Sequence, residues 1–281
     1  MAVEPLTQAQ LQAYLARIGF SDAPCCDLET LDGIIGAHVQ AIAFENIDVQ
    51  MGRRLRTDTA AAFAKLVEDG RGGWCYEHNG VLSAALAAIG FDVMRISAGV
   101  MRQVRGDAAM GTHLCLLVEC NGPRVVDAGF GSWLGASVPL RQGAWEQPPL
   151  PVSLATTEDG FWRLSVGLGD NAMSYDFRAQ AAEEDQLSAL CDWQCSDPAS
   201  VFVQNLAVQR RDDARYLGLR GKVFSEVTAQ GEVRRELASD ADLVALLRDV
   251  FWLNVPEAAR LWPAICARHE ALFGAQAAPT T

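Results

Sequence analysis

The sequence predicts an α+β fold with a helical bundle first, an antiparallel β structure next, and a mixed segment last. In residues 1–90, apolar side chains recur at the three- and four-residue spacing of helices, and from Phe91 onward the period changes to two. A chain of 281 residues can hold two or three modest domains. We therefore expect domains at residues 1–90, 91–190 and 191–281.

Four amphipathic helices are expected in the first segment. Thr7 is followed three residues later by Gln10, which is the spacing of a capping box. Gly90 stands where a glycine usually ends a helix. The expected helix starts are Thr7, Asp27, Asp58 or Thr59, and Cys75. Four helices of this size favour a small bundle.

Short runs of alternating polarity fill the middle segment, separated by turns. They favour an antiparallel barrel or sandwich, and they cover residues 93–100, 112–120, 124–127, 161–166 and 173–177. Residues 142–151 are rich in proline and polar groups, so we expect a loop there.

The last segment mixes both patterns. Helices are expected from Ser239 and from Pro256, and residues 274–281 are expected to fray. The strand-like runs are residues 201–203, 216–219 and 222–227.

Composition excludes several classes of protein. Half of the residues are hydrophobic and 21% are charged, which is typical of a globular chain. The net charge of -12 argues against a general nucleic-acid binder. Neither a signal peptide nor a long apolar run is visible, so we expect a cytoplasmic protein without membrane contact. The eight cysteines show no zinc-ligand spacing, and we expect neither a metal nor a disulfide scaffold.

The stretch from Arg71 to Asn79 contains the candidate nucleophile. Gly72 and Gly73 form a turn that places Cys75 at the start of a helix. Unpaired amides and the positive end of the helix dipole favour the thiolate there, and the thiolate is the nucleophilic form of cysteine. The alternative interpretation of Cys75 is a small buried apolar residue.

A predicted β-hairpin supplies the partners of this cysteine. His113 lies on its first strand and Asp127 on its second. His113 is placed to accept the thiol proton, and Asp127 to hold the imidazole in the right tautomer. Each residue alone is more often structural, whereas the three together indicate nucleophilic catalysis. Of the other histidines, His78 lies on the helix of the nucleophile itself and is expected to project along it, and His38 and His269 are interpreted as structural.

The hairpin also carries a geometric prediction. Directly opposed residues of an antiparallel pair share a face, and their numbers add to a constant. His113 and Asp127 share a face only if the connecting loop holds an odd number of residues. We therefore predict a loop of three or five residues that includes Asn121 and Gly122, or a compensating bulge.

Five short motifs resemble those of the arylamine N-acetyltransferases, and the resemblance covers nearly the whole chain. The R-G-G-x-C signature matches Arg71–Cys75, and F-E-N matches Phe44–Asn46. The family's histidine matches His113, and its D-x-G-F-G loop matches Asp127–Gly131. The stretch Pro198–Phe202 is similar to its P-x-S-x-F motif.

The resemblance implies a three-domain fold: a helical bundle, a central antiparallel β-barrel and a C-terminal α/β lid, with a cysteine-protease-like Cys-His-Asp site. It also implies a ping-pong transfer of acetyl from acetyl-coenzyme A, through Cys75, to an aromatic amine or hydrazine. Ala43 departs from the family, which often has a proline before F-E-N.

The resemblance further assigns roles to individual residues. Cys75, His113 and Asp127 would be catalytic, and Arg71 would pair with Glu45, and with Asp48 as a further partner, to support the site. The implied acceptor-pocket residues are Phe44, Val100, Phe130 and Phe202. The implied coenzyme A contacts are Thr112, Gly129, Gly131 and Ser200.

Three alternatives share these residues. An amide synthase or a cysteine hydrolase would use the same triad with another acceptor. A non-catalytic protein that binds aromatic amines or coenzyme A belongs to a different class. The intact triad argues against this last alternative, because a pure binder has no need of a base beside a helix-start cysteine.

Overall fold

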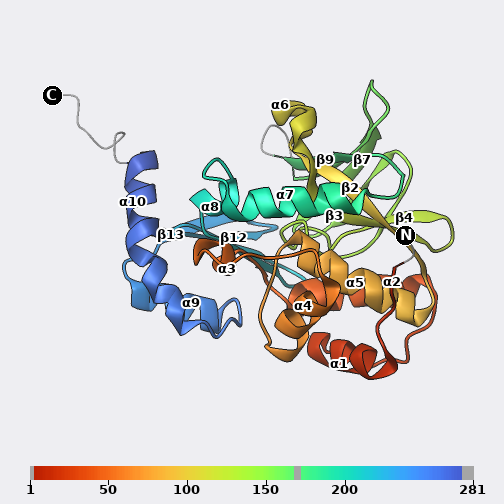
Figure 1. The fold of residues 1–281 in the computed structure, drawn as a ribbon, viewed down its shortest axis with the longest axis horizontal. Helices are drawn as coiled ribbons and strands as arrows, with labels where there is room; N and C mark the ends of the chain where they lie inside the picture. Colours follow the sequence, from red (N-terminus) through yellow and green to blue (C-terminus); the bar gives the residue numbers. More distant parts are fainter. Residues whose placement is uncertain (1–2, 168–171, 274–281) are drawn as a thin grey trace.

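The computed structural model describes residues 3–167 and 172–273 of the chain, so the expected frayed end at residues 274–281 lies outside the described residues. Figure 1 shows the first helices on one side, the strands of the middle segment beside them, and the last third of the chain extending away toward α10. The fold is α+β, as predicted, with two separate antiparallel sheets.

Helices form the first part of the chain, and their starts agree with the predicted caps. Thr7 and Gln10 form a complete capping box, and the Asp27 and Asp58 side chains accept backbone amides of the turns that they open. Gly19 and Gly90 end their helices in the left-handed conformation. The elements are α1 (Gln8–Ile18), α2 (Leu28–Ala41), α3 (Ile47–Gln50), α4 (Thr59–Phe63), the π-helical turn η1 (Ala64–Glu68) and α5 (Cys75–Ile89).

The middle of the chain forms an eight-stranded antiparallel sheet in the order β5-β4-β3-β2-β9-β8-β7-β6. The Gln147 side chain closes the gap between its ends, because it bonds Gly135 and Ala136 close to β5. The sheet is thus a nearly closed barrel, as expected. Its strands are β2 (Asp92–Val100), β3 (Met110–Glu119), β4 (Pro123–Val126), β5 (Val138–Pro139), β6 (Gly143–Gln147), β7 (Leu150–Thr156), β8 (Trp162–Val166) and β9 (Met173–Phe177).

The loop predicted at residues 142–151 is wrong. Strand β6 and the start of β7 occupy it, with Trp145 opposite Val152. Pro148 and Pro149 fall in the turn between the two strands, where no ladder amide is required. The prolines therefore mark a tight connection between two strands.

The last third builds a five-stranded sheet in the order β1-β10-β11-β12-β13. Figure 1 shows α9 and α10 at the far end of this part of the chain. Apolar side chains of α9 and α10 form one core with β10, β11 and β12. The elements are β1 (Phe44–Glu45), β10 (Ala207–Arg211), β11 (Tyr216–Arg220), β12 (Val223–Thr228), β13 (Gly231–Glu236), α9 (Asp240–Asp249), the 3-10 helix η4 (Pro256–Leu261) and α10 (Trp262–Phe273).

The strand predicted at residues 201–203 is also wrong. This segment is the one-turn helix α8 (Val201–Gln204), because the Ser200 hydroxyl accepts the Phe202 amide and caps it. The cap outweighs the strand propensity of the β-branched residues in this run. The sequence analysis missed α7 (Glu184–Ser196), α6 (Arg102–Arg105) and the 3-10 turn η2 (Asp107–Ala109).

Elements from distant parts of the chain meet around one centre. Strand β1 comes from the first segment but pairs with β10, with Phe44 opposite Gln209. Helix α7 crosses in front of β3, and α8 follows it (Figure 1). The division of the chain at residues 90 and 190 stays a prediction.

Candidate active site

Cys75 is the first residue of α5, and its side chain is 3% exposed. The Glu77 carboxylate caps the helix by accepting the Trp74 amide at 3.2 Å. The turn before it requires glycine: a Cβ on Gly72 would lie 2.3 Å from the backbone carbonyl oxygen of Ala43. Close packing therefore fixes the path of the backbone into Cys75.

The two predicted partners of Cys75 are joined by a short hydrogen bond. His113 Nε2 lies 2.7 Å from Asp127 Oδ2, and both side chains are buried. The imidazole and Cys75 line the same cavity, and the thiol is near enough to raise the pKa of the imidazole. Because Nε2 is engaged by Asp127, Nδ1 is the nitrogen left for the thiol. The structure thus brings together the three residues proposed for catalysis.

The protonation of His113 follows from its neighbours. Burial lowers its pKa, but the charge and hydrogen bond of the Asp127 carboxylate, together with the nearby Cys75, raise it more, to about 10. His113 is therefore an imidazolium at neutral pH. A positive imidazolium beside a thiol favours the thiolate, the reactive form of cysteine.

The hairpin that carries His113 and Asp127 has the predicted odd loop. Glu119 pairs with Pro123, so the loop holds the three residues between them, including Asn121 and Gly122. Asn121 and Gly122 have φ of 54° and 97°, the region that favours these two residue types. The prediction of a three- or five-residue loop is confirmed.

Asn79 holds the hairpin against α5, a role that was not predicted from the sequence. Its Nδ2 donates to Asp127 Oδ1 at 2.8 Å and to the Leu114 carbonyl at 2.6 Å. Its Oδ1 accepts the Ala128 amide at 2.9 Å. The available signal was its position four residues after Cys75, on the same face of the helix.

A buried ion cluster supports the glycine turn. Arg71 donates to Glu45 at 2.7 Å and to Asp48 at 3.4 Å, so the predicted contacts of Arg71 are present. Lys65 bonds Asp48 at 2.9 Å and Glu77 at 3.0 Å. Burial raises the pKa of Glu77 to about 6, although Lys65 opposes the shift. The cluster ties η1, the F-E-N segment and the start of α5 together.

A cavity of about 320 Å³ opens over Cys75 and His113. The cavity is lined by all four predicted acceptor-pocket residues and by three of the four predicted coenzyme A contacts: Phe44, Val100, Phe130, Phe202, Thr112, Gly129 and Gly131. The backbone at Gly129 passes close to Cys75, and only glycine fits there, because a Cβ would lie 2.5 Å from Cys75 Cα. Ser200 is not part of the lining; it is buried and donates to the Gln194 carbonyl.

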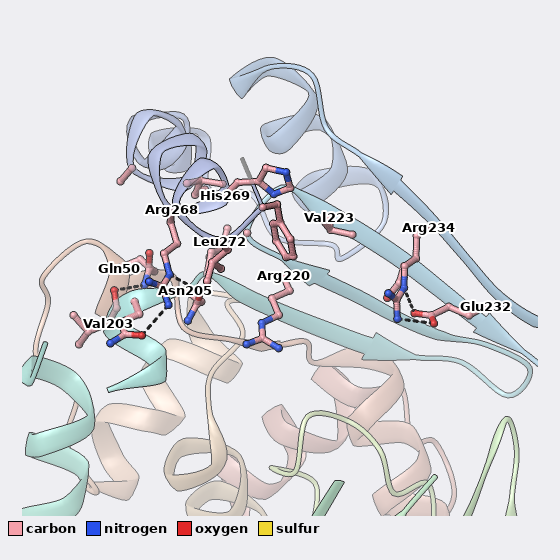
Figure 2. A pocket seen from close by; sticks show the side chains of 17 residues that line it. Gln50, Val203, Asn205, Arg220, Val223, Glu232, Arg234, Arg268, His269 and Leu272 are labelled. Carbon is pink, nitrogen blue, oxygen red and sulfur yellow. Dashed lines mark hydrogen bonds and ion pairs between the residues drawn. The ribbon is translucent and has the colours of Figure 1, made fainter. Parts of the chain in front are cut away.

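A second cavity of about 550 Å³ adjoins the first. Figure 2 shows its lining side chains between α10 and the strands of the C-terminal sheet. Asn205 and Arg220 line both cavities. Its other basic side chains are Arg234, Arg268 and His269. The two cavities therefore share a wall that includes Arg220.

Two negative findings apply to residues 3–167 and 172–273. No helix in this part of the chain has the length and apolarity to span a bilayer. Nor do these residues contain a group of three or more histidine, cysteine or acidic side chains that could hold a metal ion.

Known proteins resemble this chain along most of its length. The family described as "N-acetyltransferase" matches residues 27–260. An arylamine N-acetyltransferase of Mycolicibacterium smegmatis is 37% identical over 75% of this chain and 80% of its own. One of Mycobacterium bovis is 33% identical over 88% and 90%. A solved Mycobacterium marinum arylamine N-acetyltransferase in complex with CoA superposes with a TM-score of 0.83, at 31% identity, over 91% of this chain and 98% of that one. The chain therefore belongs to the arylamine N-acetyltransferase family.

Proposed function

We propose that this protein transfers acetyl from acetyl-coenzyme A to an aromatic amine or hydrazine through a thioester on Cys75. The observation that carries the proposal is the position of Cys75 beside the hydrogen-bonded His113–Asp127 pair in an aromatic-walled cavity. Family membership supports the same acyltransferase activity.

In the first half-reaction, the Cys75 thiolate attacks the thioester carbonyl. The tetrahedral oxyanion forms beside the first amides of α5, since the start of a helix leaves amides without an intrahelical acceptor. The carbon–sulfur bond to coenzyme A then breaks, and the His113 imidazolium gives its proton to the departing thiolate. Asp127 keeps the imidazole oriented during this transfer.

In the second half-reaction, the amine nitrogen attacks the Cys75 thioester, and neutral His113 takes the proton that the nitrogen loses. Collapse of the tetrahedral intermediate releases the amide and regenerates the thiolate. Phe44, Phe130 and Phe202 wall the cavity, and rings of this kind bind an aromatic acceptor by burial and offset stacking.

The donor would occupy both cavities. Thr112, Gly129 and Gly131 contact its acyl end in the first cavity, and the basic second cavity takes the phosphates. Ser200 supports the site indirectly, since it caps the turn that carries Phe202. We also place the protein in the cytoplasm, where reducing conditions keep its eight free cysteines reduced.

Incubation with acetyl-coenzyme A alone, followed by intact mass measurement, tests this function. We expect one stable acetyl group on Cys75, which a simple arylamine then removes. Rapid loss of the acetyl group without amine would indicate a hydrolase, and absence of any adduct would indicate a binding protein.

A further inference from the structure

Three buried side chains from three helices form a hydrogen-bonded chain beneath the active-site turn. Tyr14 of α1 lies 2.8 Å from His38 Nδ1, and His38 Nε2 lies 2.8 Å from His78 Nδ1. His78 Nε2 then lies 3.0 Å from the Gly73 carbonyl and 3.2 Å from the Ala43 carbonyl. All three side chains are 0% exposed.

The two carbonyl oxygens at the end of this hydrogen-bonded chain determine the direction of every hydrogen bond in it. Carbonyl oxygens only accept, so His78 Nε2 carries a proton and donates to both of them. A neutral His78 then has a lone pair on Nδ1, which accepts from His38 Nε2. His38 Nδ1 in turn accepts from the Tyr14 hydroxyl. Burial lowers the pKa of both histidines, that of His78 to about 4, so both are neutral at pH 7.

The two carbonyls at the end of the chain belong to a backbone bridge between the two motif segments. The Gly73 amide donates to the Ala43 carbonyl at 3.2 Å, and the Glu45 amide donates to the Gly73 carbonyl at 2.7 Å. Gly73 stands two residues before Cys75, and Ala43 directly precedes Phe44. The His78 ring also stacks on Phe44, with centroids 6.4 Å apart and planes 16° apart. One imidazole thus contacts both the backbone bridge next to the nucleophile and the ring of one cavity wall.

We propose that His78 is a positioning residue for acyl transfer, and that His38 and Tyr14 hold it in the neutral Nε2–H tautomer. The catalytic consequence of this positioning rests on the proposed function. Each bridge carbonyl already accepts one backbone amide, so the backbone can remain paired without His78. What His78 adds is the alignment of the bridge, and a small displacement of a nucleophile lowers a rate by one to two orders of magnitude.

Two substitutions at residue 78 separate positioning from folding. In His78→Leu we expect the single-turnover acetylation of Cys75 to fall by about tenfold or more, with the KM for acetyl-coenzyme A changed by less than about threefold. In His78→Gln the amide can donate to the same carbonyls, so we expect the rate to recover to within about threefold of wild type. Alkylation of Cys75 by iodoacetamide should follow the same order.

Phe91→Leu serves as the matched control. Phe91 is buried in the same helical core but lies beyond the end of α5, and it is not a member of the hydrogen-bonded chain of Tyr14, His38 and His78. We expect a lower melting temperature with an unchanged acetylation rate. If His78→Leu is folded and acetylates within twofold of wild type, the positioning role is wrong. If His78→Leu does not fold, the acetylation rate of His78→Gln and nitrogen-15 NMR of the wild type test the positioning role.

Nitrogen-15 NMR of the histidine rings in the wild type provides that test. Both His38 and His78 should show the neutral Nε2–H tautomer at pH 7 and retain it at pH 5.5. A protonated ring, or the Nδ1–H tautomer in either residue, would overturn the proposal. If the wild type passes this test and the alkylation order holds but no acetyl group is taken up, acyl transfer fails while the positioning of Cys75 stands.

Discussion

The Arg71 guanidinium donates to the Glu45 carboxylate across 2.7 Å, and this contact joins the two segments that flank the nucleophile. Glu45 is 0% exposed and Arg71 is 15% exposed, so the pair is largely shielded from water. Glu45 Oε2 also accepts the Ile47 amide at 2.7 Å, which fixes the carboxylate from its other side. The ion pair therefore has a defined geometry, unlike a solvated surface pair.

We predict that Arg71→Ala lowers the free energy of unfolding by about 3 kcal/mol, because it leaves the Glu45 carboxylate buried and uncompensated. Acetylation of Cys75 should slow as well. Denaturant titration and single-turnover kinetics measure the two effects. Arg248→Ala is the matched control: its partner Asp249 is exposed, and stability should not change measurably. A folded Arg71→Ala variant with wild-type acetylation would remove the pair's role in the site.

Cys75 should be alkylated first by limiting iodoacetamide, since the neighbouring His113 imidazolium favours the thiolate. Cys25 and Cys26 are exposed and provide the natural competitors. Peptide mapping after partial labelling gives the order of reaction. Preferential labelling of Cys25, Cys26 or Cys266 would contradict the assignment of the nucleophile.

Asp127→Asn should keep the fold but reduce turnover by about three to four orders of magnitude, because the amide favours the wrong imidazole tautomer. The remaining oxygen of the amide can still accept from Asn79 and from the Gly129 amide. Circular dichroism checks the fold, and intact mass after acetyl-coenzyme A checks the chemistry. Acetylation at the wild-type rate would exclude Asp127 from the triad.

Asn79→Leu should lower the free energy of unfolding by about 1–3 kcal/mol, since it leaves the Ala128 amide without its acceptor in a buried site. It should also slow acetylation, because Asp127 loses one of its hydrogen bonds. Ser83→Ala on the same helix is the control, since the Ser83 hydroxyl bonds only its own turn. Equal effects of the two substitutions on acetylation would show that Asn79 has no special function in holding the hairpin.

Stability should fall as the pH drops from about 6.5 to about 4. Burial lowers the pKa of His78 to about 4, so the unfolded chain binds a proton in this window that the folded chain does not. Each such histidine contributes up to about 1.4 kcal/mol per pH unit. Glu77, with a pKa raised to about 6, acts in the opposite direction, and His113, raised to about 10, is protonated in both states below pH 6.

The difference between wild type and His78→Gln isolates this contribution, because Glu77 and His113 are present in both proteins. We expect denaturant midpoints measured at pH 7, 5.5 and 4.5 to depend less on pH in the variant. An identical pH dependence of the two proteins would mean that His78 titrates normally in the folded state.

Local signals in the sequence were sufficient for the long helices of the first segment and for the position of the nucleophile. Caps such as Thr7 and Asp27 act within one turn, so the residues that define them are adjacent in the chain. The parity of the hairpin was likewise readable, since it depends only on the loop between Glu119 and Pro123. The sequence also identified the walls of the cavity through the family resemblance.

Features that depend on distant partners were not readable. Every residue of β13 is exposed, so its sequence lacks the apolar alternation of a half-buried strand. The chain from Tyr14 to His78 joins three helices, and no spacing along the sequence relates its members. The helical pattern indicates a structural role for His38 and places His78 along the helix of the nucleophile, but their shared tautomers follow only from the packed bundle.

The pairing of β1 with β10 has a consequence for how the protein is made. Phe44 leaves the ribosome early, but its strand partner Gln209 emerges more than 160 residues later. Cys75, His113 and Asp127 are all synthesised before that point. A nascent or truncated chain that ends before β10 thus carries the reactive thiol without the strand that orders one wall of the acceptor cavity. The cavity over Cys75 is thus completed only after the three proposed catalytic residues have been synthesised, because Gln209 and Arg220 also line it.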